Sequence, residues 1–311
     1  MITRNKIVQP VHNWIYNRGE RVKYYNFWKD QSPNEMWFSR FIKTHFAGRR
    51  MPRINFTSVL GPVEEMRDNR CGINIFYTGE NLHSERFSKQ KKLLEQQNYD
   101  LVLGFDHAGL GNYMRLPLWV LWCFPPEADR KTIDRIVNSM RYPVVGDRGD
   151  FCCLICSHDF NGVRGQIMDG LSSIGMVTSA GRYRNNTKLL QEVFHDDKVA
   201  FMRNYRFAIC PENSNADGYV TEKLFDAILG GCIPVYSGSN NIPEPEVING
   251  EAIKFWNAGG DNDAIIDEIR YLESNNQAYR EFVWQARLKD EAEEIVWQYY
   301  VTLEERINQV L

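Results

Sequence analysis

The stretch from residue 206 to residue 236 most constrains how this chain can fold. An apolar run, RFAIC, leads into the polar residues PENSNADGY, then into a helix-like segment, TEKLFDAILGG, and a second apolar run, CIPVY. Two strands that flank one helix form a strand–helix–strand unit with parallel strands. In sheets of this kind ligands bind beyond the carboxyl ends of the strands, where PENSNADGY lies. The stretch therefore predicts a parallel sheet with a ligand site at this edge.

Polar residues around the start of the helix point to an anion. Thr221 is placed to cap the helix, and free amides with the positive dipole end at such a turn favour a phosphate. Lys223 in the first turn is contrary to the dipole preference, which indicates a ligand such as a pyrophosphate. Glu222 could accept hydrogen bonds from sugar hydroxyls or oppose a developing positive charge, and Asn213 and Ser214 supply neutral donors and acceptors. The alternative is a capped helix with incidental surface charges, and these residues alone leave both open.

Short apolar runs alternate with helical patterns along the chain, as in α/β folds with parallel sheets. We expect strands within 21–28, 53–60, 72–79, 99–105, 151–159, 206–213 and 232–238, and helices within 34–46, 83–98, 162–175, 221–231, 263–274 and 276–311.

The length favours two domains, because 311 residues are many for one core. Segment 135–150 interrupts the alternation with Pro143 and closely spaced Asp and Gly residues, and we interpret it as the linker. The predicted domains are 1–146, and 147–311 with the C-terminal helices.

Composition excludes several classes of protein. A net charge of -3 with 25% charged residues argues against a general nucleic-acid binder. No apolar run approaches the roughly 20 residues of a membrane helix, and the N-terminus lacks the apolar core of a signal peptide. We expect a cytoplasmic protein, with peripheral membrane association left open.

The seven cysteines fit a reducing compartment, since their odd number and spacing do not suggest disulfides. Cys152, Cys153 and Cys156 fall in a predicted buried strand. A zinc site is disfavoured there because the paired spacing is not repeated elsewhere.

Residues 207–242, FAICPENSNADGYVTEKLFDAILGGCIPVYSGSNNI, closely resemble the donor-site signature of the α-1,3-fucosyltransferases, which move fucose from GDP-fucose onto sugars. Pro211 replaces the usual Phe before Glu-Asn-Ser, which should alter packing rather than ligand contacts. INIFYTGENLHSERF and YDLVLGFDHAGLGNYMRLPLWV resemble two first-domain elements of this family, and VKYYNFWKDQSPNEMWFSRFI resembles the N-terminal loop and helix of bacterial members. The resemblance covers most of residues 20–245, and the heptad repeats and basic amphipathic tail of some bacterial members are absent.

The resemblance implies a fold of two facing Rossmann-like domains, the GT-B type, with the active site in the interdomain cleft. The first would be the acceptor-side domain and the second the GDP-sugar domain. Arg164, in NGVRGQIMDGL, and Lys223 would hold the GDP diphosphate, because a planar, permanently charged donor suits phosphate oxygens. Asn213, Tyr219 and Glu222 would contact ribose, base or fucose. The alternatives are a surface role for Arg164 and a packing role for Tyr219.

The family reaction inverts the fucose anomeric carbon, which requires a base and a stabilised leaving diphosphate but no covalent enzyme intermediate. Glu80, in TGEN, matches the family's proposed base and follows the strand INIFY. The alternative is a loop Glu that caps a helix or forms an ion pair. Asn81 would be a structural partner.

No metal or other cofactor is demanded, because Arg164 and Lys223 can neutralise the diphosphate. The DND at 261–263 resembles an Asp-X-Asp metal motif weakly, and a solvated turn is the preferred interpretation. The histidines His83, His107 and His158 lack ligand spacing.

Aromatic faces pack well on sugar rings, which makes Trp28 a weak acceptor candidate, and His107 is a second. Trp119 and Trp122 could take the same role, but we prefer the core for both.

The leading prediction is therefore an α-1,3-fucosyltransferase acting on an N-acetylglucosamine-containing glycan, in synthesis of a bacterial surface polysaccharide or lipopolysaccharide. One alternative keeps the fold with another linkage or GDP-sugar. Another is a non-catalytic glycan- or nucleotide-binding protein. The acceptor cannot be chosen from the sequence, because acceptor contacts come from variable loops of the first domain.

Overall fold

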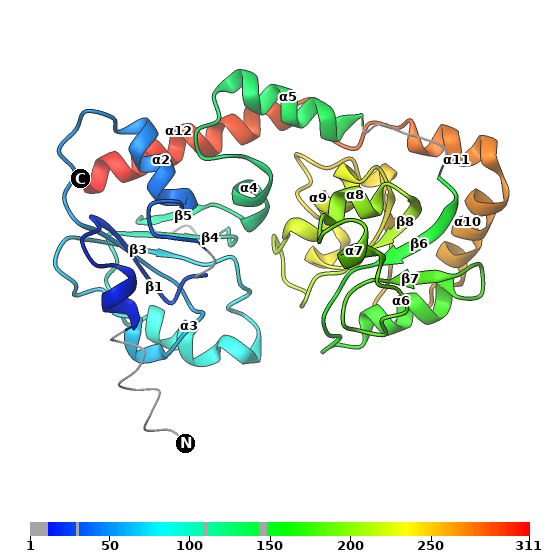
Figure 1. Cartoon of the computed structure of the whole chain (residues 1–311), viewed down its shortest axis with the longest axis horizontal. Coiled ribbons are helices and arrows are strands. Elements are labelled where there is room, and N and C mark those ends of the chain that lie inside the picture. Colours follow the sequence, from blue (N-terminus) through cyan, green and yellow to red (C-terminus); the bar gives the residue numbers. More distant parts are fainter. Residues whose placement is uncertain (1–11, 29–30, 108–110, 143–147) are drawn as a thin grey trace. The chain divides into compact units, whose positions relative to one another are not determined.

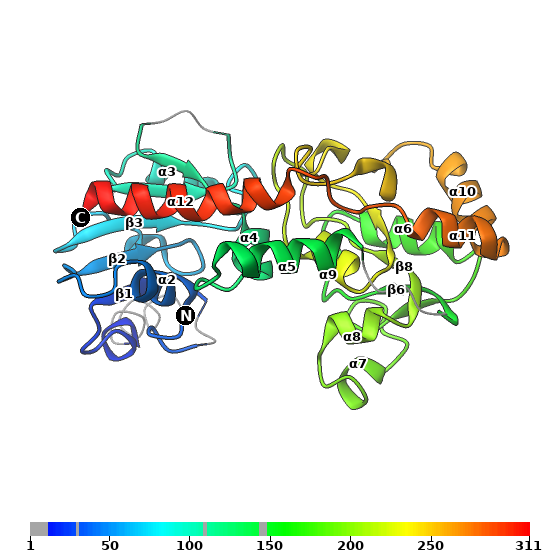
Figure 2. The ribbon, with the colours of Figure 1, turned by 90° about the horizontal axis from the view of Figure 1, so that it is seen from above.

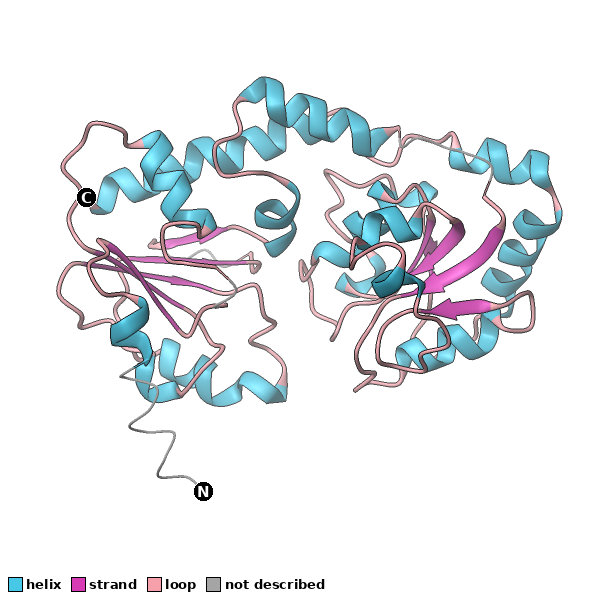
Figure 3. Cartoon of the chain, in the orientation of Figure 1, coloured by secondary structure: helices cyan, strands magenta, loops and turns pink. Residues whose placement is uncertain are grey.

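The computed structural model describes residues 12–28, 31–107, 111–142 and 148–311, and the chain forms two compact units. Unit 1 holds residues 1–130 and 296–311, and unit 2 holds residues 131–295. Each unit has a five-stranded parallel sheet with helices on both faces (Figures 1 and 3). The predicted α/β class with parallel sheets is confirmed.

The predicted boundary lies at residue 146, whereas the two units divide within helix α5 (Arg130–Arg141) and within helix α12 (Ala292–Val310). The predicted linker is wrong over 135–141, which belongs to helix α5 (Arg130–Arg141). Ile133, Val137 and Met140 are buried at helical spacing, a pattern that the turn-forming residues further on obscured. Residues 143–147, including Pro143, lie outside the described residues.

In unit 1 the strands lie in chain order and all pair in parallel. They are β1 (Val22–Tyr25), β2 (Ile54–Thr57), β3 (Ile73–Tyr77), β4 (Leu101–Gly104) and β5 (Tyr113–Arg115). The first four fall within predicted strands. The prediction missed β5, which at three residues is too short to show a period.

Helices cover both faces of this sheet. One face carries α2 (Trp37–His45) and the part of α12 (Ala292–Val310) that belongs to unit 1, and the other carries η2 (Glu85–Phe87) and α3 (Ser88–Leu94) (Figure 1). Shorter elements are η1 (Val63–Glu65) and α4 (Leu118–Cys123). Figure 2 shows α12 lying along the sheet. Tyr300 of α12 is 1% exposed, and its ring lies 5.9 Å from the rings of Trp37 and Phe41 on α2.

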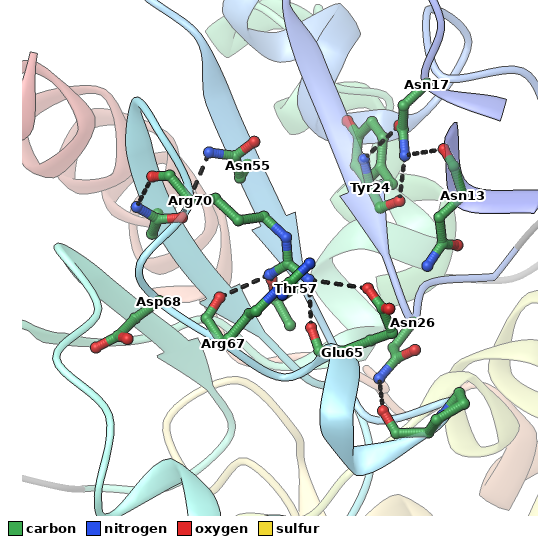
Figure 4. A network of polar contacts seen from close by, with 12 residues as sticks. Asn13, Asn17, Tyr24, Asn26, Asn55, Thr57, Glu65, Arg67, Asp68 and Arg70 are labelled. Carbon is green, nitrogen blue, oxygen red and sulfur yellow. Dashed lines mark hydrogen bonds and ion pairs between the residues drawn. The ribbon is translucent and has the colours of Figure 1, made fainter. Parts of the chain in front are cut away.

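Arg70 fixes the loop beyond the carboxyl ends of β1 and β2 (Figure 4). Its guanidinium donates to the backbone carbonyls of Glu65 and Arg67, each at 2.6 Å, and to the Glu65 carboxylate at 3.1 Å. It also lies 3.7 Å from the ring centroid of Tyr25. Burial lowers the pKa of Arg70, against the opposing influence of Tyr25 and Glu65. Arg70 and Glu65 thus form a buried ion pair that holds the loop in place.

In unit 2 the sheet order is β10-β9-β8-β6-β7, again with only parallel pairs among the described strands. The strands are β6 (Asp150–Leu154), β7 (Val177–Ser179), β8 (Tyr205–Ile209), β9 (Ile233–Tyr236) and β10 (Lys254–Phe255). The prediction missed β7 and β10, the two shortest. Because β8 lies on the opposite side of β6 from β7, the strand order reverses between β6 and β8.

The helices of unit 2 form two layers (Figure 1). One consists of α6 (Val163–Leu171), α10 (Asp263–Ser274) and α11 (Asn276–Val283) and the other of α7 (Leu189–Glu192), α8 (Lys198–Met202) and α9 (Glu222–Leu229). The 3-10 turns η3 (Ser239–Asn241) and η4 (Gly250–Ala252) follow β9. Alternate strand residues such as Cys152, Leu154 and Phe207 pack in one core cluster with Ile167 of α6 and Ile269 of α10.

The predicted helix over 276–311 is interrupted at residues 284–291, between α11 and α12. Arg141 accounts for the interruption. Its guanidinium donates hydrogen bonds to the backbone carbonyls of Leu288 and Lys289 and forms an ion pair with Glu293 at 2.8 Å. The backbone amide of Arg287 donates to the Arg141 carbonyl. These backbone groups are therefore used outside a helix.

Arg70→Met should lower the free energy of unfolding by about 3 kcal/mol, because it leaves the buried Glu65 carboxylate without its charged partner. Urea denaturation measures the change. Arg67→Met, at an exposed side chain in the same loop, is the control and should stay within about 0.5 kcal/mol of the parent. Equal effects of the two substitutions would contradict the role of Arg70.

Candidate functional site

A cavity of about 250 Å³ lies in unit 2 at the point where the strand order reverses. Leu154 and Ile209, the last residues of β6 and β8, both line it. Open α/β sheets bind ligands at such a point, beyond the carboxyl ends of the strands. The other lining residues are Ile155, Cys156, Ser157, His158, Arg164, Gly181, Lys198, Met202, Cys210, Pro211, Asn213, Glu222, Lys223 and Asp226.

Arg164 is built into the wall of this cavity. It lies in the first turn of α6 and is 3% exposed. Its Nη1 donates to the carbonyl of His158 at 2.6 Å and its Nη2 to Oδ1 of Asn213 at 2.7 Å. A surface role is thus excluded, and two predicted residues, Arg164 and Asn213, are joined directly.

The start of α6 is tightly held. Gly162 precedes the helix with φ 76°, in the left-handed region that glycine adopts readily. The carboxylate of Asp159 then accepts hydrogen bonds from the amides of Arg164 at 3.2 Å and Gly165 at 2.8 Å. The sequence prediction did not identify Asp159, which fixes the helix turn that carries Arg164.

Glu212 organises the other wall. The side chain is 2% exposed, and its carboxylate accepts from the amide of Thr221 at 2.8 Å, the Thr221 hydroxyl at 2.6 Å, Nζ of Lys223 at 3.3 Å and the Tyr236 hydroxyl at 3.4 Å. Glu212 is not among the residues that line the cavity, and it positions Thr221 and Lys223 from behind them.

Thr221 occupies the position before α9, as predicted, but its side chain makes no capping hydrogen bond to the helix. Its hydroxyl donates to Glu212 and accepts from Lys223 Nζ at 2.9 Å. The hydrogen bonds to the buried carboxylate and from the ammonium hold the hydroxyl where it does not accept from the helix amides.

Lys223 and the carboxylates around it stabilise one another in their charged forms. Burial opposes the ammonium, but the carboxylates of Glu212 and Glu222 outweigh it and raise the pKa of Lys223. Burial likewise opposes the Glu222 carboxylate, but Lys223, a backbone hydrogen bond and Lys198 hold its pKa below the ordinary value. The Lys223 contribution to stability is lost only as pH rises through its raised pKa, and that of Glu222 only as pH falls through its lowered pKa. Both groups are therefore charged around neutral pH.

The cavity is lined by one arginine and two lysines, Arg164, Lys198 and Lys223, and by two carboxylates, Glu222 and Asp226. Lys198, at the start of α8, and Asp226, in α9, belong to this set but were not predicted. Asp226 lies on the helix of the predicted motif, one turn after Glu222 and Lys223, and that spacing could have revealed it. Lys198 lies outside the motif and gave no signal.

Tyr219 is placed differently from its predicted neighbours. It is 2% exposed and is not among the residues that line the cavity. Its contact with a donor stays a prediction.

Glu80 lies in unit 1, half-buried, in the turn after β3. Its backbone amide donates to the Thr78 hydroxyl at 3.0 Å. Burial raises the pKa of the fully enclosed Tyr77, and the Glu80 carboxylate acts in the same direction. Trp28 lies against the same tyrosine, with ring centroids 6.1 Å apart.

The remaining aromatic and histidine candidates are scattered. His107 is exposed beyond β4. Trp119 is fully buried, in agreement with the expected core role, whereas Trp122 is 56% exposed and the core expectation for it is wrong.

No group of metal-ligating side chains occurs among the described residues. In the DND segment, Asp261 accepts the amide of Asp263 and Asn262 bonds to the backbone of Asn257, as in a solvated turn before α10. Cys152 and Cys153 are buried in β6. Within the described part of the chain, no helix has the length and apolar character to cross a membrane.

Comparisons with known proteins agree with the sequence resemblance. The family model for the α-(1,3)-fucosyltransferase FucT N-terminal domain matches residues 22–122. The model for the C-terminal part of glycosyltransferase family 10 (fucosyltransferase) matches residues 147–306.

Among curated proteins, α-(1,3)-fucosyltransferase FucT of Helicobacter pylori is 26% identical over 84% of this chain, which spans 58% of the length of that relative. The α-(1,3)-fucosyltransferase B of Drosophila melanogaster is 30% identical over 30% of this chain and 21% of its own length.

Solved structures share the fold. A crystal structure of an α1,3-fucosyltransferase with GDP-fucose has a TM-score of 0.58 at 21% identity, over 91% of this chain and 90% of that one. A second, with GDP, has a TM-score of 0.56 at 20% identity, over 96% and 97%. The predicted class, two Rossmann-like domains of the GT-B type, is confirmed. With one family model covering residues 147–306, more than half of its length, the chain belongs to glycosyltransferase family 10, the fucosyltransferases.

Proposed function

We propose that the protein is an inverting fucosyltransferase that moves L-fucose from GDP-fucose to a hydroxyl of an N-acetylglucosamine-containing glycan, with α-1,3 linkage. The observation that carries the proposal is the convergence of Arg164 and Lys223 on one cavity at the strand-order reversal, in a chain of this family. Two cations held beside a cavity at this point suit a nucleotide diphosphate.

Arg164 and Lys223 bind the diphosphate in different ways. Three of the five guanidinium N–H groups of Arg164 donate to His158, Asn213 and Pro211, which fixes the plane of the group before ligand arrives. Lys223 contributes a point charge whose direction is set by Glu212 and Thr221. Lys198 adds a third positive charge. Prepositioned charges of this kind stabilise a leaving diphosphate without rearrangement in the reaction.

Glu80 is the proposed base. The acceptor oxygen attacks the anomeric carbon of fucose, Glu80 takes the hydroxyl proton, and the bond from that carbon to the phosphate oxygen breaks with GDP as the leaving group. Arg164 and Lys223 meet the charge that develops on the diphosphate. This single displacement inverts the anomeric carbon, and a metal ion is dispensable because the chain supplies the cations. Glu222, Asn213 and Tyr219 are the proposed contacts to fucose, ribose or base.

A role in bacterial surface polysaccharide or lipopolysaccharide synthesis stays a prediction, as does a cytoplasmic location. One alternative is an enzyme of the same fold that forms another linkage or uses another GDP-sugar. The other is a non-catalytic protein that binds a glycan or a nucleotide. The presence of Glu80 together with Arg164, Glu222 and Lys223 in the sequence disfavours the non-catalytic one.

A panel of glycan acceptors with GDP-fucose tests the proposal. The protein should release GDP only with a true acceptor, equally with and without EDTA, and linkage analysis should show an α-1,3 product. Glu80→Gln should abolish transfer, because the amide cannot take the proton, while GDP binding is kept. Transfer by this variant at the parent rate would remove Glu80 from the mechanism, and no transfer with any acceptor would contradict the proposal.

Lys223→Ala should weaken GDP binding by about 10- to 100-fold, the loss expected for a charged hydrogen bond of roughly 1.5–3 kcal/mol. Isothermal titration calorimetry measures the affinity. Lys188→Ala is the matched control, since Lys188 is exposed and does not line the cavity. Because its neighbours raise the pKa of Lys223, the difference between parent and Lys223→Ala should persist from pH 7 to pH 9. Unchanged GDP affinity in Lys223→Ala would exclude the phosphate role.

A further inference from the structure

An aromatic pair lies at the rim of the cavity in unit 2. The ring of Phe160 stacks on the imidazole of His158, with the centroids 4.0 Å apart and an angle of 26° between the two planes. His158 lines the cavity, whereas Phe160 does not line it and is 77% exposed. Because His158 covers one face of the Phe160 ring, the exposed surface includes the other face. The pair therefore presents a flat apolar surface beside the cavity.

The loop between β6 and α6, which carries Phe160, is fixed by the residues on either side of it. Nη1 of Arg164 donates to the carbonyl of His158 at 2.6 Å. The carboxylate of Asp159 accepts hydrogen bonds from the amides of Arg164 at 3.2 Å and Gly165 at 2.8 Å. The ring is thus held in a set position relative to Arg164, and a surface that is already ordered binds a ligand at a lower cost in entropy.

The cavity is small for a nucleotide sugar. Its volume of about 250 Å³ lies below the roughly 300–1,000 Å³ of ordinary small-molecule pockets. A diphosphate bound by Arg164 and Lys223 would therefore leave another part of the donor outside the cavity. The nucleobase is the flat part of the donor, and a base can cover the whole face of an aromatic ring.

We propose that the open face of Phe160 is the platform on which the nucleobase of the donor stacks, with His158 supporting the ring from beneath. The proposal rests on the proposed function and adds a donor contact outside the motif at 206–236. Every base has a π-face, so stacking of this kind adds affinity without distinguishing guanine from other bases.

Calorimetric titration of the full chain with GDP and with inorganic pyrophosphate separates the contribution of the base from that of the phosphates. Phe160→Ala should weaken GDP binding about tenfold, or about 1.4 kcal/mol, and leave pyrophosphate binding unchanged. Lys223→Ala should weaken the binding of both, because its charge acts on phosphate. Trp284→Ala is the matched control: Trp284 is an exposed aromatic residue of the same unit that does not line the cavity, and its removal should change neither affinity.

A second variant, Phe160→Trp, reports the contact directly. It keeps an aromatic ring at the rim, so it should bind GDP as the parent does. The added indole should lose fluorescence when GDP binds but not when pyrophosphate binds. The eight native Trp residues give a background that the parent protein, titrated in the same way, corrects for.

Three results would overturn the platform. The first is unchanged GDP affinity in Phe160→Ala. The second is an equal loss of GDP and pyrophosphate binding, which would show that the substitution disturbs the loop of Arg164. The third is weaker binding of GDP-fucose with unchanged binding of GDP, which would place the sugar on the ring.

Transfer from GDP-fucose is measured separately. GDP binding that needs Phe160, without transfer to any acceptor, would support the platform and contradict the fucosyltransferase. Transfer by Phe160→Ala at the parent KM for GDP-fucose would do the reverse. A parent protein that binds no GDP would contradict both.

Discussion

The buried carboxylate of Glu212 is the constraint on which unit 2 depends. It follows β8, accepts from Thr221 at the start of α9, and reaches the Tyr236 hydroxyl at the end of β9. One side chain therefore ties together both strands and the helix of the strand–helix–strand unit. A charge buried at 2% exposure is tolerated only with such partners. Lys223 is one of them, so the interaction that stabilises the fold also aims a cation into the cavity.

Much of this arrangement could be predicted from the sequence, because long elements show their period and a long motif shows its chemistry. The segment 206–236 predicted the strands, the helix and three residues that line the cavity, Asn213, Glu222 and Lys223. The sequence could not show how hydrogen bonds are shared once the chain is folded. Thr221 carries the right residue type for a cap, yet a buried carboxylate nine residues earlier takes its hydroxyl. Lys198 reaches the cavity from α8 only through tertiary packing.

Failures of the fold prediction have the same origin. Residues 135–141 follow a helical period, but Pro143 and nearby glycines and aspartates dominated the pattern. Continuous helical character over 276–311 hid a break that Arg141 imposes through backbone carbonyls far along the chain. The strands β5, β7 and β10 have two or three residues each and exist because neighbouring strands pair with them.

The last helix has a consequence for biosynthesis. Residues 296–311 complete unit 1, where Tyr300 packs on Trp37 and Phe41, although the rest of that unit ends at residue 130. Domains generally fold in the order of their synthesis, the N-terminal one first. In this chain the first unit to be translated is the last to be completed: it waits with an uncovered apolar face until the ribosome has made the second unit and the helix that follows it.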